Sequence, residues 1–233
     1  MYKNILFFWF VPAMIKTLYE YCKKGWNRKD EERLGKKMAK IEECFGYKSI
    51  WFAIKDVEVD RLLSCCPYLK YVHETTWSDG LREAGEKWQS KAMLSGPYDG
   101  WTFLVGNWLW DVSEVDQIVT VMSHMGECAG EVCFFASHRV SDAYAFAKLE
   151  QGKMIRLYSY ADGQMFGCIG KKSDVEETLH LNLAEREEDL FKDGFDTLDE
   201  DDVLRIAAEW SMDPETLFGR EEARTIILEK ICR

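Results

Sequence analysis

The sequence has little proline and no long apolar run, and these shortages narrow the kind of protein that it encodes. Four prolines and sixteen glycines among 233 residues leave no linker, low-complexity tract or fixed-period repeat. The apolar run Ile5–Ile15 has eleven residues, whereas a membrane-spanning helix needs about 20. With 47% hydrophobic and 14% aromatic residues, the chain can bury a large core without metal or disulfide support. We therefore expect one continuous globular unit.

The usual motifs of metal and nucleotide sites are also missing. The sequence has no C-x-x-C pair and its four histidines are scattered, which excludes the common zinc spacings. No two glycines five apart are followed directly by Lys and then Ser or Thr, which excludes a phosphate-binding loop. The acidic run 193–202 lacks the alternating ligands of a calcium loop. We therefore expect no metal and no cofactor.

Hydrolytic chemistry needs a nucleophile beside a base, and Ser137-His138 is a pair of the required types. Successive residues of a strand point to opposite faces, so this serine and this histidine cannot serve each other directly. Because no catalytic triad can be assembled from the sequence, we assign no catalytic residue. This favours a non-enzymatic protein and keeps an enzyme as the alternative.

The cysteines indicate reduced thiols in a cytoplasmic setting. Disulfide frameworks are typical of short secreted chains, and this chain is long and shows no cleavable secretory signal. Most of the thiols are then expected to be small core side chains. The eight cysteines are Cys22, Cys44, Cys65, Cys66, Cys128, Cys133, Cys168 and Cys232.

Charge divides the chain into a basic beginning and an acidic body. Residues 1–40 hold ten Lys/Arg and four Asp/Glu, a net charge of +6, so residues 41–233 carry the remaining −17 of the total −11. An acidic body repels phosphate backbones, which argues against nucleic-acid binding, and it attracts a basic protein. Residues 185–202 contain ten acidic residues and only two basic ones, Arg186 and Lys192. The alternative is an acidic surface that keeps the protein soluble.

The first segment, residues 1–40, is apolar and then basic, and we treat it separately from a single acidic domain over residues 41–233. Basic residues that flank an apolar segment hold that flank in the cytoplasm. Membrane association through residues 4–22 would therefore leave the domain cytoplasmic. The alternative is that the apolar run packs on the domain and the basic residues lie on its surface.

Hydrophobic periodicity predicts an α+β fold. Four strand-like runs over residues 131–169 are joined by the hairpin signals Gln151-Gly152 and Asp162-Gly163, which predicts an antiparallel meander. Tyr144 and Phe146 share one face of the second run and its alanines the other, so we expect helices packed on one face of the sheet. Further strands are expected at 49–55, 69–77, 91–94 and 101–105, and helices at 30–45, 57–66, 78–88, 113–125, 173–181 and after 197.

Aromatic, charged and histidine side chains near predicted turns are the candidate site residues. His138 and Arg139 end a predicted strand, where they can bind an anion or a carboxylate. Trp108 and Trp110 follow Gly106 in a connection, where an aromatic ring can reach solvent. One hypothesis is a pocket lined by His138, Arg139, Trp108 and Asp99. The other is a partner-binding surface to which Asp99, Trp108, Trp110, His138, Arg139, Asp193 and Asp196 contribute.

Three stretches carry a resemblance to a known group: GPYDGWTFLVG (96–106), CFFASHRVSDAYAFAKLEQGKMIRLYSYADG (133–163) and DDVLRIAAEWSMDP (201–214). Together they resemble a family of uncharacterised bacterial α+β proteins over residues 47–218. In size, acidity and architecture the chain is similar to small acidic immunity proteins of bacterial toxin systems. That similarity implies a protein that binds and blocks a basic partner such as a toxin.

Overall fold

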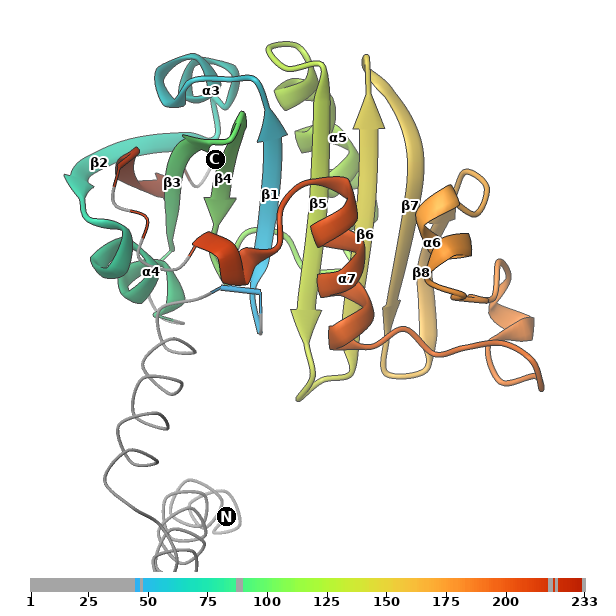
Figure 1. Ribbon diagram of the computed structural model, residues 1–233. Coiled ribbons are helices and arrows are strands. Elements are labelled where there is room, and N and C mark those ends of the chain that lie inside the picture. The colour runs from blue at the N-terminus through green and yellow to red at the C-terminus, as the bar shows by residue number, and fades with distance from the viewer. Residues whose placement is uncertain (1–44, 47, 87–89, 218–219, 221, 232–233) are drawn as a thin grey trace, which may run out of the picture. The chain divides into compact units, whose positions relative to one another are not determined.

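The computed structural model describes residues 45–46, 48–86, 90–217, 220 and 222–231, which form a nine-stranded antiparallel sheet with helices (Figure 1). The strand order is β2-β9-β3-β4-β1-β5-β6-β7-β8. The strands are β1 (Ile50–Lys55), β2 (Leu69–Thr75), β3 (Lys91–Tyr98), β4 (Trp101–Val105), β5 (Glu131–His138), β6 (Ala143–Glu150), β7 (Lys153–Ala161), β8 (Gln164–Ile169) and β9 (Arg224–Lys230). The predicted α+β class is confirmed.

The helices are short and lie between the strands in the chain. They are α3 (Val59–Cys65), α4 (Trp77–Gly85), α5 (Val115–Gly126), α6 (Asp174–Thr178) and α7 (Glu200–Trp210), with 3-10 turns η1 (Glu187–Asp189) and η2 (Pro214–Leu217). Among the described residues, no helix is both long enough and apolar enough to cross a membrane. Residues 1–44 lie outside the described residues. They include the segment 1–40, to which the membrane hypothesis applies, and all but the last residue of the helix expected at 30–45.

The predicted meander is confirmed, because β5, β6, β7 and β8 pair consecutively and antiparallel. Its two tight turns explain the register. Gln151 (φ 48°) precedes Gly152 (φ 74°), and Asp162 (φ 46°) precedes Gly163 (φ 80°). Two successive residues with positive φ give the turn twist that matches a right-handed hairpin. The hairpin signals in the sequence therefore report the actual connections.

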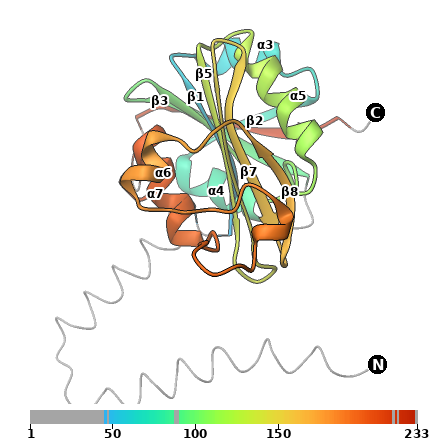
Figure 2. The same ribbon diagram turned by 90° about the vertical axis from the view of Figure 1, so that its right-hand side faces the viewer.

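Helices cover both faces of the sheet, so the prediction of helices on one face is wrong (Figure 2). Side chains of α3 and α5 join one apolar core with Phe52 and Ile54, and side chains of α4 and α7 join a second core with Trp51 and Ala53. The central strands are apolar on both sides, and a single helical layer would leave one side in water. The small-residue face of β6 does receive a helix: Ala143, Ala145 and Ala147 lie in the same core as Ile118 and Met122 of α5.

Helix starts follow local hydrogen bonding. Thr76 caps α4, which begins one residue before the expected residue 78, by accepting a hydrogen bond from the backbone N–H of Asp79. Asp199 caps α7 by accepting from the N–H of Asp202. Ser173 and Glu176 form a capping box at the start of α6.

Gly170 ends β8 in a conformation that only glycine suits. Its φ is +78°, and a Cβ atom there would lie 2.0 Å from the carbonyl oxygen of Ile155 on β7. We expect Gly170→Ala to lower the free energy of unfolding by about 3 kcal/mol, because the left-handed backbone and the backbone clash both oppose a side chain. Gly152→Ala is the matched control: its φ is +74°, but a Cβ there meets nothing within 4 Å.

Urea unfolding of both variants measures this difference. The control is expected to lose about 1 kcal/mol, the cost of the backbone conformation alone. Equal losses at the two positions would show that the contact with Ile155 does not constrain the edge of the sheet.

Candidate functional site

A cavity of about 430 Å³ opens where β1 begins, β5 ends and the connection from β4 to α5 passes by. Its floor is apolar and belongs to the α5 side of the sheet. The floor residues are Ile50, Val112, Ala136 and Ala143. This volume lies within the range of about 300–1,000 Å³ that is typical of small-ligand sites. We call this cavity the His138 pocket.

Polar side chains surround the apolar floor. Asp111 is held in place because its Oδ1 accepts hydrogen bonds from the backbone N–H of Ser113 at 3.0 Å and from the Ser113 hydroxyl at 2.7 Å. Asn107 is held by donation of its Nδ2 to the carbonyl oxygen of Gly85 at 3.3 Å. The polar residues at the lining are Lys48, Asn107, Asp111, Ser137, His138 and Ser141, of which Ser137 turns its hydroxyl to the other face of the sheet. The pocket therefore offers both a cation and a carboxylate.

His138 pairs with Ser141 rather than with Ser137. The Ser141 hydroxyl lies 2.7 Å from Nδ1 of His138, and the Ser141 backbone N–H donates to the His138 carbonyl oxygen at 3.0 Å. The turn after β5 brings these two residues together. Sequence reasoning missed Ser141 because it compared only neighbouring residues, whereas a turn juxtaposes residues three apart.

Ser137 faces the opposite side of the sheet, as the strand alternation predicts. Its hydroxyl donates to Oε1 of Glu200 at 2.7 Å, and the backbone N–H of Lys48 donates to the same oxygen at 3.2 Å. Arg139 also turns to this carboxylate, with its Nη1 3.7 Å from Glu200 Oε2. Arg139 is therefore not among the residues that line the His138 pocket.

Asp99 lies at the opposite end of the sheet from His138. It occupies the turn between β3 and β4, beside Asp56 at the end of β1, and it pairs with Arg220 at 2.7 Å. His138 lies near the start of β1, since the Ser137 N–H donates to the carbonyl oxygen of Ser49. The six residues of β1 separate the two positions by roughly 20 Å, at about 3.3 Å a residue. The hypothesis of a pocket containing Asp99 is therefore wrong.

The two tryptophans of the connection face the β9 side. Trp110 is only 3% exposed and belongs to the core, so it offers no surface to a partner. Trp108 is half-buried and donates its Nε1–H to the carbonyl oxygen of Lys91. The ammonium of Lys230 lies 5.7 Å from the Trp108 ring and 5.6 Å from the Trp110 ring. Both rings are therefore packing residues, and the connection contributes Asn107 and Asp111 to the His138 pocket instead.

Part of the acidic tract, which we define as residues 185–202, is used to hold its own fold. Asp189 accepts hydrogen bonds from Lys192 at 2.6 Å and from Arg186 at 2.8 Å, and these cations hold the pKa of Asp189 below its usual range. Asp199 caps α7, and Glu200 binds Ser137. Such roles account for some of the acids and leave others at the surface.

Asp193 and Asp196 lie in the acidic tract between η1 and α7, and both are exposed. Asp196 shapes the loop because its Oδ2 accepts the backbone N–H of Asn182 at 2.7 Å. Two phenylalanines flank Asp193: Phe191 is 80% exposed and Phe195 is 36% exposed. Sequence reasoning missed both rings, although an aromatic residue on each side of Lys192-Asp193-Gly194 was visible in the sequence.

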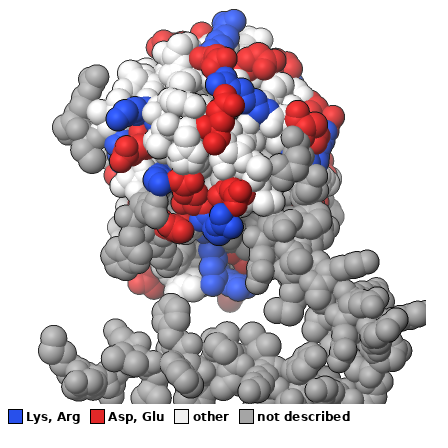
Figure 3. All heavy atoms as spheres, turned by 90° about the vertical axis from the view of Figure 1, so that its left-hand side faces the viewer, with Lys and Arg blue, Asp and Glu red and all other residues white. Residues whose placement is uncertain are grey.

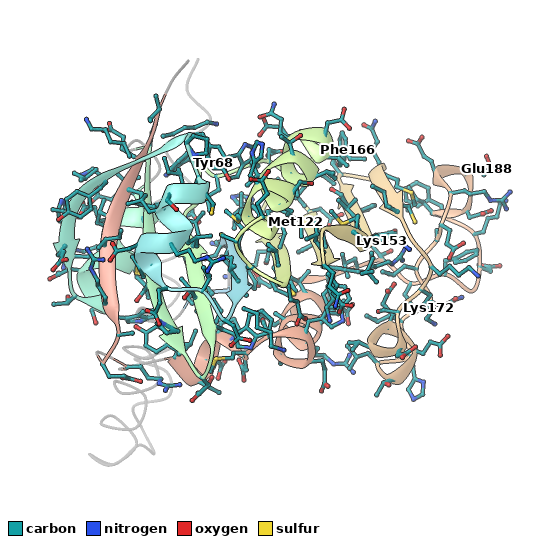
Figure 4. All side chains as sticks on the ribbon, turned by 90° about the horizontal axis from the view of Figure 1, so that it is seen from above. Tyr68, Met122, Lys153, Phe166, Lys172 and Glu188 are labelled. Atoms are coloured by element: carbon teal, nitrogen blue, oxygen red, sulfur yellow. The ribbon has the colours of Figure 1, made fainter. Side chains whose placement is uncertain are left out.

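The opposite end of the sheet is balanced in charge. Figure 3 shows the face at β2, where acidic and basic side chains are interspersed. Arg224 pairs with Asp60 and Glu74, and Glu83 contacts both Lys91 and His73. Glu188 of the acidic tract is labelled in Figure 4 on the side of the molecule away from β2. This part of the acidic tract is therefore distant from the charge-balanced face at β2.

Comparisons with protein-family models, curated proteins and solved structures find no match to this chain. Within the described residues, no group of three or more His, Cys, Asp and Glu side chains is arranged to hold a metal ion. The candidate sites are therefore the His138 pocket and the acidic tract with its exposed phenylalanines.

Proposed function

We propose that the chain is a non-enzymatic protein-binding module whose acidic tract docks a basic partner. The observation that carries this proposal is the exposure of Phe191. Its side chain is 80% exposed in a segment, residues 185–202, that contains ten acidic and two basic residues. Binding hot spots at protein–protein interfaces are often large aromatic side chains, and the rim around them is polar or charged. The acids would steer a basic protein towards the ring and favour it over acidic competitors.

The position of Phe191 supports this assignment. A Cβ atom on Gly163 would lie 3.2 Å from the Phe191 ring, so the ring lies beside the turn between β7 and β8. Asp193 and Asp196 are exposed in the same loop. The ring therefore projects from a supported loop, and a partner that covered it would bury the aromatic surface without reorganising the sheet.

We further propose that the partner is a basic toxin and that the chain acts as an immunity-type inhibitor. This step rests on the similarity in size, acidity and architecture to acidic immunity proteins. A second candidate function, binding of a small ligand, is favoured by one observation, the His138 pocket.

Affinity capture on the immobilised chain, followed by measurement of Kd with the purified partner, tests the docking surface. We expect Phe191→Ala to weaken binding about 30-fold, because replacing an aromatic hot-spot residue with alanine costs about 2 kcal/mol or more of binding free energy. Tyr71→Ala is the matched control, since Tyr71 is an exposed aromatic on β2 at the charge-balanced end. That variant is expected to bind as the unaltered chain does.

The salt dependence of the same Kd tests the electrostatic half of the proposal. Added salt is expected to weaken binding mainly by slowing association, and Asp193→Asn should reduce that dependence. A captured partner that binds Phe191→Ala as tightly as the unaltered chain would refute the docking surface. So would a partner of acidic character.

A further inference from the structure

We propose that the His138 pocket binds a small zwitterion, with a carboxylate and an ammonium attached to a short aliphatic body, as in an aliphatic amino acid. The pocket has an apolar floor, basic side chains at Lys48 and His138, and an acidic side chain at Asp111. This inference rests on the second candidate function, small-ligand binding at this pocket, and is independent of partner docking at the acidic tract, because Phe191 and Asp193 are not among the lining residues.

The basic side of the pocket is positioned by the turn after β5. The Ser141 hydroxyl lies 2.7 Å from Nδ1 of His138. When this hydroxyl donates to Nδ1, the ring hydrogen is on Nε2, which can donate to a ligand. A ligand carboxylate is the acceptor that best matches this donor and the ammonium of Lys48, which also lines the pocket.

The anionic side is held by its own backbone. Both hydrogen bonds that Ser113 donates to Asp111 end on Oδ1, which leaves Oδ2 to accept from a ligand ammonium. The backbone N–H of Asp111 donates to Glu114 Oε2 at 2.9 Å, so this residue is fixed from both sides. The Nδ2 of Asn107 is engaged by Gly85, and its Oδ1 is a second acceptor on the rim.

The two charged sides together decide the ligand class. Because Lys48 and Asp111 both line the pocket, a simple anion would leave Asp111 without a counter-charge in the ligand, and a simple amine would leave Lys48 without one. A zwitterion satisfies both sides at once, and its aliphatic carbons cover Ile50, Val112 and Ala136 on the floor.

Calorimetric titration of the full chain with alanine, valine and leucine tests the inference. Two probes share most of the carbon skeleton of leucine but carry one charge: 4-methylpentanoate lacks the ammonium, and 3-methylbutylamine lacks the carboxylate. We expect saturable binding of at least one amino acid and about tenfold weaker binding of each single-charge probe, because each forfeits one charge-assisted hydrogen bond.

Variants assign each charge to its side of the pocket. Asp111→Asn is expected to weaken amino-acid binding about tenfold and to leave 4-methylpentanoate binding unchanged or tighter, whereas His138→Gln should weaken both. Asp116→Asn, an exposed acid in the first turn of α5, is the matched control and should bind normally. Urea midpoints equal to that of the unaltered chain show that the variants are folded.

Three results would overturn the inference: no saturable binding of any of the three amino acids, binding of 3-methylbutylamine as tight as that of leucine, or unchanged amino-acid binding by a folded Asp111→Asn. Each leaves the docking proposal untouched, because that proposal is measured with a protein partner and the Phe191→Ala variant.

Discussion

Replacing Glu176 with Gln is expected to lower the free energy of unfolding by about 3–5 kcal/mol, because it leaves a buried guanidinium without its counter-charge. Arg156 on β7 and Glu176 on α6 are each 1% exposed. Arg156 donates from Nε to Oε2 at 3.0 Å and from Nη2 to Oε1 at 2.8 Å. Two parallel hydrogen bonds of this kind are the strongest form of ion pair between side chains.

The surroundings of the pair make the loss severe. Burial opposes the charge on Arg156, but the hydrogen bonds and charge of Glu176, together with the contact to Cys168, outweigh that effect and hold the pKa of Arg156 above its usual range. The guanidinium lies over the rings of Phe146 and Tyr158, 6.0 and 5.7 Å from their centroids. Glu176 also accepts from the backbone N–H and hydroxyl of Ser173. The pair therefore joins α6 to the sheet.

Denaturant unfolding of a double-mutant cycle measures this pair. Arg156→Met alone and Glu176→Leu alone should each be as damaging as Glu176→Gln, and the double variant Arg156→Met with Glu176→Leu should recover much of the loss, because no charge then stays buried. Arg82→Met is the control: Arg82 and Asp79 are 74% and 51% exposed in their pair, and exposed pairs contribute about 0–1 kcal/mol. Additive losses in the double variant would show that the two charges do not act as a unit.

Trp210→Ala is expected to cost about 3–5 kcal/mol, because it removes a large buried ring and leaves a cavity between α7 and the sheet. Trp210 is 7% exposed. Its ring meets Phe146 edge to face, with centroids 5.5 Å apart, and lies 6.3 Å from Phe135. The Lys148 ammonium lies 5.7 Å from the same ring. This side chain is therefore a main contact of α7 with β5 and β6.

Thermal and urea unfolding of Trp210→Ala and Trp210→Phe test this role. The phenylalanine variant keeps an aromatic edge against Phe146 and is expected to lose about half as much as the alanine variant. Phe191→Ala is a useful control, because its 80% exposed ring contributes little to folding and should change stability by less than about 0.5 kcal/mol. A Trp210→Ala loss as small as that of Phe191→Ala would contradict the packing role.

The sequence predicts the meander well because its information is local. Two of its three turns carry a glycine and a preceding residue with positive φ, as at Gln151-Gly152. The position of β9 could not be predicted in this way. The local sequence of Arg224–Lys230 does not indicate that this strand inserts between β2 and β3. Its pairing is long-range, because Lys230 pairs with Leu69 and Glu229 pairs with Lys91. Long-range pairing depends on the whole core.

The same limitation explains the outcome for the candidate site. His138 and the turn that follows it were visible in the sequence, and the structure places a pocket there. Asp99 and Trp108 seemed equally suitable because both follow glycine-marked turns. Which end of the sheet a turn occupies depends on strand order and direction, and β4 carries the chain from the Asp99 end to the Asn107 end. Composition near a turn does not contain that information.

The insertion of β9 between β2 and β3 has a consequence for how the protein must be made. During synthesis, residues 69–98 leave the ribosome more than a hundred residues before Arg224–Lys230, the strand that joins them. Until then β2 and β3 each present an unpaired edge, which is a template for pairing with another chain. The interval before β9 emerges is therefore the period in which these two edges are open to pairing with another chain.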